Sequence, residues 1–66
     1  MKAKRLLAAL LRIGWTEDLT RRKASHRTLR REGYATYTFA FHDGEEIGSS
    51  MVAIVAKRTG LRPEDL

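Results

Sequence analysis

An apolar stripe near the start of the chain sets the first limit on its fold. Between Ala3 and Ile13 the apolar residues recur at helical spacing, while the basic residues fall off the stripe. Gly14 follows, and glycine readily adopts the left-handed conformation that ends a helix. The pattern predicts an amphipathic helix over this segment, with Trp15 folded back onto its last turn as a packing residue.

Three short stretches that favour β-structure come next. Residues 16–23 are charged and predict a weak strand at the edge of a sheet. Residues 26–31 and 34–42 flank Glu32-Gly33 and predict a β-hairpin. The middle of the chain is therefore expected to form three antiparallel strands.

The last of these stretches indicates which face of the sheet is buried. It alternates small or polar residues with three aromatic ones, Tyr37, Phe39 and Phe41. A loop of about three residues that pairs Leu29 with Ala35 puts Leu29 on the same aromatic face, whereas a one-residue slip exposes it. The residues then expected on the opposite, uncovered face are His26, Thr28 and Arg30.

A second helical pattern closes the chain. Ser49 predicts the N-cap of a helix that runs to about Thr59 and ends at Gly60. The residues expected to face inward are Met51, Val52, Ile54 and Val55. Two helices on one face of a three-stranded antiparallel sheet bury both apolar stripes, so we predict a single α+β domain over residues 1–66, of order α-β-β-β-α.

Composition excludes several classes of protein. The chain has no cysteine, which removes disulfides, thiol catalysis and thiolate metal sites, and its length leaves no room for a cofactor cavity. With two histidines and scattered carboxylates, we expect no metal site and no other cofactor. No apolar run approaches the ~20 residues of a membrane span. The leucine-rich start lacks a signal-peptide cleavage site, so we expect a cytoplasmic protein.

The formal net charge of +5 is unevenly distributed. One segment without acidic residues carries Arg21, Arg22, Lys23, Arg27, Arg30 and Arg31. A basic patch on a small domain favours a polyanionic partner, of which nucleic acid is the commonest. A solvated basic surface without a partner explains the charge equally well, so charge alone does not decide between them.

The order of elements, together with several short motifs, resembles the HicA toxin family. The segments that carry the resemblance are Leu6-Leu7 to Gly14-Trp15, Lys23-Ala24-Ser25-His26, Phe41-His42, and Gly48-Ser49-Ser50-Met51 to Gly60-Leu61. The chain departs from the family's pattern in two respects. Ala24 stands where the family has a glycine, and the segment between Trp15 and Ser25 is slightly longer.

The resemblance implies a fold like the double-stranded-RNA-binding domain and the activity of an mRNA interferase. Such a protein is an endoribonuclease and the toxin of a type II toxin–antitoxin system, which takes part in the stress response. It also implies a HicB-like antitoxin protein and mRNA as partners, and it places the catalytic histidine of the family at His26.

The residues themselves can support this chemistry without a metal. The 2′-OH of RNA can attack the adjacent phosphorus if one group takes its proton and cations stabilise the charge on the phosphate. Histidine changes protonation near neutral pH, so His26 is the candidate for proton transfer. The candidate RNA-binding residues are Arg22, Lys23, Ser25, Arg27 and Arg30. His42 is a candidate second acid–base or RNA-contacting group, and it can equally serve only to shape its loop.

Two other interpretations remain open. One is a non-catalytic RNA-binding module of the same fold, and the other is an interaction protein whose basic face docks an acidic partner. The residues alone favour His26 as a simple polar group on an open sheet, and the resemblance favours catalysis. Tyr34, at the expected hairpin tip, is the aromatic residue most free to meet RNA.

Overall fold

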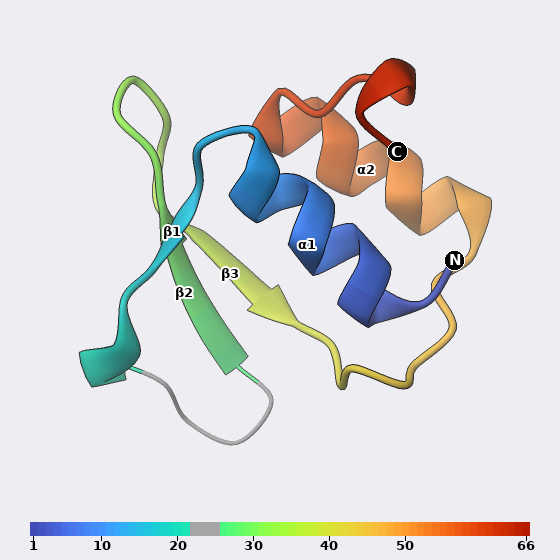
Figure 1. The fold of residues 1–66 in the computed structure, drawn as a ribbon, viewed down its shortest axis with the longest axis horizontal. Helices are drawn as coiled ribbons and strands as arrows, with labels where there is room; N and C mark the ends of the chain where they lie inside the picture. Colours follow the sequence, from blue (N-terminus) through green and yellow to red (C-terminus); the bar gives the residue numbers. More distant parts are fainter. Residues whose placement is uncertain (22–25) are drawn as a thin grey trace.

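The computed structural model describes residues 1–21 and 26–66, and both of its α-helices lie on one side of a three-stranded antiparallel sheet (Figure 1). In chain order the elements are α1 (Ala3–Arg12), β1 (Thr16–Glu17), the 3-10 helix η1 (Leu19–Arg21), β2 (His26–Arg30), β3 (Tyr37–Ala40), α2 (Ser49–Thr59) and the 3-10 helix η2 (Pro63–Asp65). The predicted α+β fold is confirmed. Within the described residues, no helix is long and apolar enough to cross a membrane.

Helix α1 has the predicted amphipathic character and the predicted end. Its buried residues are Ala3, Leu6, Leu7, Ala9 and Leu10. Gly14 has a φ of 113°, and the Trp15 N–H donates to the Leu10 carbonyl at 3.1 Å. The Trp15 indole N–H donates to the Thr59 carbonyl at 3.1 Å, so this residue joins the ends of the two helices.

The hairpin has the predicted faces but a different register. Leu29 pairs with Tyr37, not with Ala35, and β3 begins three residues later than predicted. Tyr34, predicted to begin this strand, lies outside β3 and packs its ring against Trp15 with 5.5 Å between centroids. A slip of two residues preserves the alternation of the strand, so every side chain of β2 keeps its predicted face.

The predicted edge strand over residues 16–23 is wrong for residues 18–21, and its last two residues lie outside the described part of the chain. The Asp18 carboxylate accepts hydrogen bonds from the backbone N–H of Thr20 at 3.1 Å and from its hydroxyl at 2.6 Å. Such a local aspartate turn competes with strand pairing and bends the chain into η1. Strand β1 is therefore a two-residue edge beside β2.

Helix α2 ends where predicted, but it begins one residue earlier and its inner face is rotated. Its N-cap is Gly48 and not Ser49, and no side chain caps its first turn. Met51 and Ile54, predicted to face inward, are 42% and 48% exposed. The buried and half-buried residues, spaced three and four apart, are Val52, Val55, Ala56 and Thr59. Thr59 can occupy this inner stripe because its hydroxyl donates to the Val55 carbonyl at 2.7 Å.

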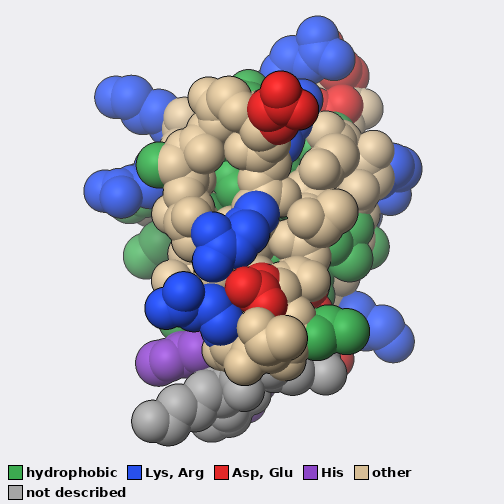
Figure 2. All heavy atoms as spheres, turned by 90° about the vertical axis from the view of Figure 1, so that its left-hand side faces the viewer, with side chains coloured by type: hydrophobic (Ala, Val, Ile, Leu, Met, Phe, Trp, Pro, Cys, Tyr) green, Lys and Arg blue, Asp and Glu red, His purple; other side chains and the backbone are tan. Residues whose placement is uncertain are grey.

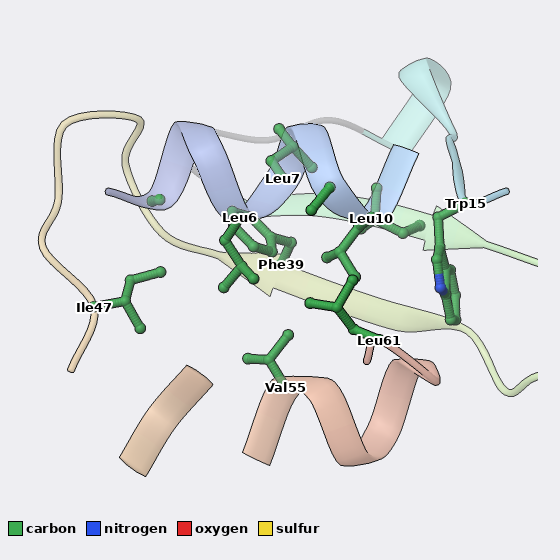
Figure 3. Close-up of a cluster of buried hydrophobic side chains, with 11 residues drawn as sticks. Leu6, Leu7, Leu10, Trp15, Phe39, Ile47, Val55 and Leu61 are labelled. Carbon is green, nitrogen blue, oxygen red and sulfur yellow. The ribbon is translucent and has the colours of Figure 1, made fainter. Parts of the chain in front are cut away.

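The core fills the space between the helices and the covered face of the sheet (Figure 3). Trp15 and Phe39 are the largest of its fully buried side chains, and Leu29 is also completely buried. Tyr37 and Phe41 pack at its border. The aromatic face of β3 therefore belongs to the core, as predicted, and only the opposite face of the sheet is open to a partner.

Candidate functional site

The open face of the sheet carries the side chains of alternate residues along β2. His26 pairs with Ala40 and Thr28 pairs with Thr38, and Arg30 completes the row. His26 and Arg30 are exposed, on the face where the parity argument predicts them. Figure 2 looks onto this side of the molecule and shows basic side chains down its middle, an acidic side chain next to them, and a histidine at the lower edge.

Two neighbours hold Arg30 over the open face. Its Nε donates to Asp18 Oδ2 at 3.4 Å, and its Nη1 donates to Thr36 Oγ1 at 3.2 Å. About half of the side chain, 48%, stays exposed. The guanidinium is thus oriented by neighbours from both adjacent strand regions and can still meet a ligand from solvent.

Asp18 is a site residue that sequence reasoning missed. The hydroxyl hydrogen bond from Thr20 is the main cause that lowers the pKa of Asp18, and Arg30 also lowers it. The Asp18 carboxylate is therefore charged at neutral pH and partly offsets the charge of Arg30. Asp18 reaches the site through the turn at residues 18–20, which places its carboxylate beside β2, and no pattern in the sequence pointed to this turn.

Arg27 points to the other face of the sheet. Its side chain is 18% exposed, and its guanidinium lies 3.3 Å from Glu17 Oε1 and 3.2 Å from Asp43 Oδ1. Arg27 thus links β1 to the loop that precedes α2. Of the two predicted arginine ligands that the structure describes, only Arg30 shares a face with His26.

Three further predicted RNA-binding residues, Arg22, Lys23 and Ser25, lie outside the described residues, as does Ala24. His42 is exposed and follows Ala40, the partner of His26, by two residues. Its carbonyl accepts the Glu45 N–H at 2.9 Å, so its backbone helps to form the turn there. Among residues 1–21 and 26–66, no group of three or more His, Asp or Glu side chains could hold a metal ion.

A hollow of about 450 Å³ lies at the hairpin end of the sheet, and sequence reasoning missed it too. Its lining includes Thr16, Arg30, Arg31, Glu32, Tyr34 and Thr36. The Arg31 guanidinium lies over the Tyr34 ring, 4.7 Å from the ring centroid. The available signal was the spacing of Arg31 and Tyr34 around the turn at Gly33, which brings a cation and an aromatic ring together.

Comparison with known proteins gives the family of the chain. A family model described as the HicA toxin of bacterial toxin-antitoxin systems matches residues 3–61. Curated proteins and solved structures gave no match. The matched span begins with the first residue of α1 and ends just after Gly60, the C-cap of α2, so it contains the whole sheet and both α-helices. The chain belongs to the HicA toxin family of bacterial toxin–antitoxin systems.

Proposed function

We propose that the protein is the toxin of a type II system and acts in the cytoplasm as a metal-independent endoribonuclease on mRNA. The observation that carries this proposal is the exposed His26 on the same open face as Arg30, in a chain of the HicA family. A general base and a phosphate-binding cation on an uncovered surface are what cleavage by the 2′-OH requires.

In the proposed reaction, His26 takes the proton of a 2′-OH as that oxygen attacks the adjacent phosphorus. The bond from phosphorus to the 5′-oxygen breaks, and the products are a 2′,3′-cyclic phosphate and a 5′-hydroxyl. The departing 5′-oxygen needs a proton, for which His42 is the candidate donor. No external oxidant, reductant or nucleophile enters this balance.

Cations are proposed to hold the RNA backbone during this step. Arg30 is the described residue best placed for it, because half of its side chain is exposed on the open face. Arg22, Lys23 and Ser25 keep the same proposed role. Since Arg27 is already engaged by Glu17 and Asp43, we assign it a smaller direct share in binding.

The deciding experiment incubates the purified protein with single-stranded RNA in EDTA. We expect cleavage to continue, to yield cyclic or terminal 3′-phosphates, and to stop when the nucleotide at the cut site lacks its 2′-OH. Activity that disappears in EDTA and returns with magnesium contradicts the mechanism. Salt-sensitive RNA binding without any cleavage identifies the non-catalytic RNA-binding module instead.

We also propose that the HicB-like antitoxin covers the open face. An acidic partner placed over Arg30 and His26 gains electrostatic steering and excludes RNA at the same time. In a titration against labelled RNA, the neighbouring gene's product should compete with RNA, and Arg30→Ala should weaken both complexes. A stable ternary complex of toxin, antitoxin and RNA would place the inhibitory contact elsewhere.

A further inference from the structure

We infer that the hollow at the hairpin end of the open face is a stacking subsite for one unpaired base of an RNA strand, with Arg31 and Tyr34 as its binding surface. This inference rests on the proposed function and names the part of the substrate that lies away from the cleaved bond. It adds Arg31 and Glu32 to the residues that meet RNA, and it gives a defined role to Tyr34, which the sequence already indicated as free to do so.

The hollow lies along the same surface as His26. Arg30 both lines the hollow and belongs to the open face, whereas His26 is at the opposite end of β2. The four residue-to-residue steps from His26 to Arg30 span roughly 13 Å at ~3.3 Å per residue. An RNA strand that crosses the open face with one phosphate at His26 therefore reaches the hollow with a nearby nucleotide.

Arg31 differs from the other arginines of the hairpin in having a free charge. Arg27 and Arg30 each pair with carboxylates, but within residues 1–21 and 26–66 no carboxylate forms an ion pair with Arg31. Arg31 is half-buried as a residue, and its guanidinium carbon lies over the Tyr34 ring, 4.7 Å from the ring centroid. Flat guanidinium and aromatic surfaces are the ones on which unpaired RNA bases stack.

Tyr34 is fixed in place before any ligand arrives. Its ring contacts Trp15 on one side, and a Cβ built on Gly60 would lie only 3.0 Å from Tyr34 Cζ. Gly60 also has a φ of 75°, so this close approach depends on glycine. Tyr34 is nevertheless 42% exposed. A rigid, half-exposed aromatic ring loses little conformational entropy when a base stacks on it.

The remaining lining suits a base better than an acidic peptide. Thr16 and Thr36 carry hydroxyl groups, and Glu32 adds a carboxylate that can accept hydrogen bonds from an exocyclic amino group. An aromatic ring, a free guanidinium and one acceptor carboxylate together select a nucleobase attached to a phosphate chain.

The test measures binding of short single-stranded RNA to the His26→Ala protein, so that cleavage does not interfere. Each RNA is compared with versions that lack the base at one position. We expect Tyr34→Leu to lower the affinity for intact RNA about tenfold. One abasic position should cause a similar loss, and Tyr34→Leu should add nothing to it. Arg31→Gln should also lower the affinity for intact RNA, whereas Tyr34→Phe should leave it unchanged.

The controls separate stacking from folding and from bulk charge. Lys57→Gln removes one exposed cation on α2 and should have much less effect than Arg31→Gln. Circular dichroism checks that Tyr34→Leu is folded, and Arg31→Gln tests the site independently of that packing change. If the loss of affinity from Tyr34→Leu adds to the loss from the missing base at every abasic position, the subsite proposal is wrong. A polyglutamate peptide whose binding depends on Arg31 and Tyr34 as strongly as RNA binding does also overturns it.

Cleavage by the parent chain distinguishes this inference from the proposed function. If the protein cleaves RNA but its binding does not depend on Tyr34 and Arg31, only the subsite proposal is wrong. If binding shows the coupling between Tyr34 and one base but no RNA is cleaved, the subsite proposal stands and the ribonuclease proposal is wrong. If the protein binds no RNA, both proposals are wrong.

Discussion

The two faces of β2 use arginine in opposite ways. On the covered face, Arg27 is 18% exposed and held between Glu17 and Asp43, next to the fully buried Leu29. On the open face, Arg30 keeps 48% of its side chain exposed and shares the surface with His26. The difference shows that basic residues in one strand do not form one binding surface. Because successive side chains of a strand point to opposite faces, each arginine either stabilises the fold or remains available to a ligand.

The largest effect is expected from the open face. His26→Ala should lower the rate of RNA cleavage by about 10²–10⁴-fold, the usual contribution of general acid–base catalysis. Because His26 is exposed, the free energy of unfolding should stay nearly unchanged. RNA affinity should also stay nearly unchanged, because the proposed role of His26 is proton transfer and the cations hold the RNA backbone. Single-turnover cleavage and RNA titration measure the two effects, with His42→Ala as the control that tests the second histidine. Cleavage by His26→Ala at the parent rate would remove the assigned role.

Substitutions on the covered face should change the free energy of unfolding. Leu29→Ala should reduce the free energy of unfolding by about 2–5 kcal/mol, because it removes a fully buried side chain from the core. Thr38→Ala, at an exposed position of β3, should change it by at most about 0.5 kcal/mol. Urea unfolding followed by circular dichroism gives both values. Equal losses in the two variants would contradict the assignment of the faces.

The two arginines themselves give the sharpest comparison. Arg27→Ala should lower the free energy of unfolding by about 1–3 kcal/mol, because it leaves the half-buried Glu17 carboxylate without this ion pair. Arg30→Ala should leave stability nearly intact and reduce the slope of log affinity against log salt by about 0.7. If the salt slope instead falls with Arg27→Ala and not with Arg30→Ala, the covered arginine is the RNA ligand.

The smallest effect concerns the acid on the open face. Asp18→Asn should raise RNA affinity by a factor of about two to five, because Arg30 loses its competing carboxylate. Hydrogen bonding by Thr20 lowers the pKa of Asp18, so the carboxylate stays charged in mildly acidic buffer. The gain should therefore be the same there as at neutral pH. Titrations of labelled RNA in both buffers measure it, and an unchanged affinity would mean that Arg30 does not touch phosphate.

Sequence reasoning identified the faces of the sheet better than its register. Leu29 was placed on the buried face because alternation depends only on parity, and the two-residue slip did not disturb it. The slip accompanies the packing of Tyr34 on Trp15, a contact between residues far apart in the chain. The inner face of α2 was mispredicted at Met51 and Ile54 because Thr59, polar by composition, occupies the inner stripe.

The candidate site was predictable to a similar degree. His26 and Arg30 follow from the alternation of β2, and that same alternation could have placed Arg27 on the covered face. Its partners Glu17 and Asp43 come from two other segments, so no local pattern pointed to them. Asp18 and the hollow likewise depend on turns that short-range periodicity does not describe.

The chain contains a single tryptophan, and its position makes it a built-in optical reporter. Trp15 is 1% exposed, donates to the Thr59 carbonyl and contacts the Tyr34 ring of the hairpin. Its fluorescence emission therefore comes from the one corner where the ends of both α-helices meet the hairpin. Unfolding of any of the three elements should change this emission, and so should a base that stacks on Tyr34. Unlabelled protein is thus sufficient to follow both folding and occupancy of the hollow.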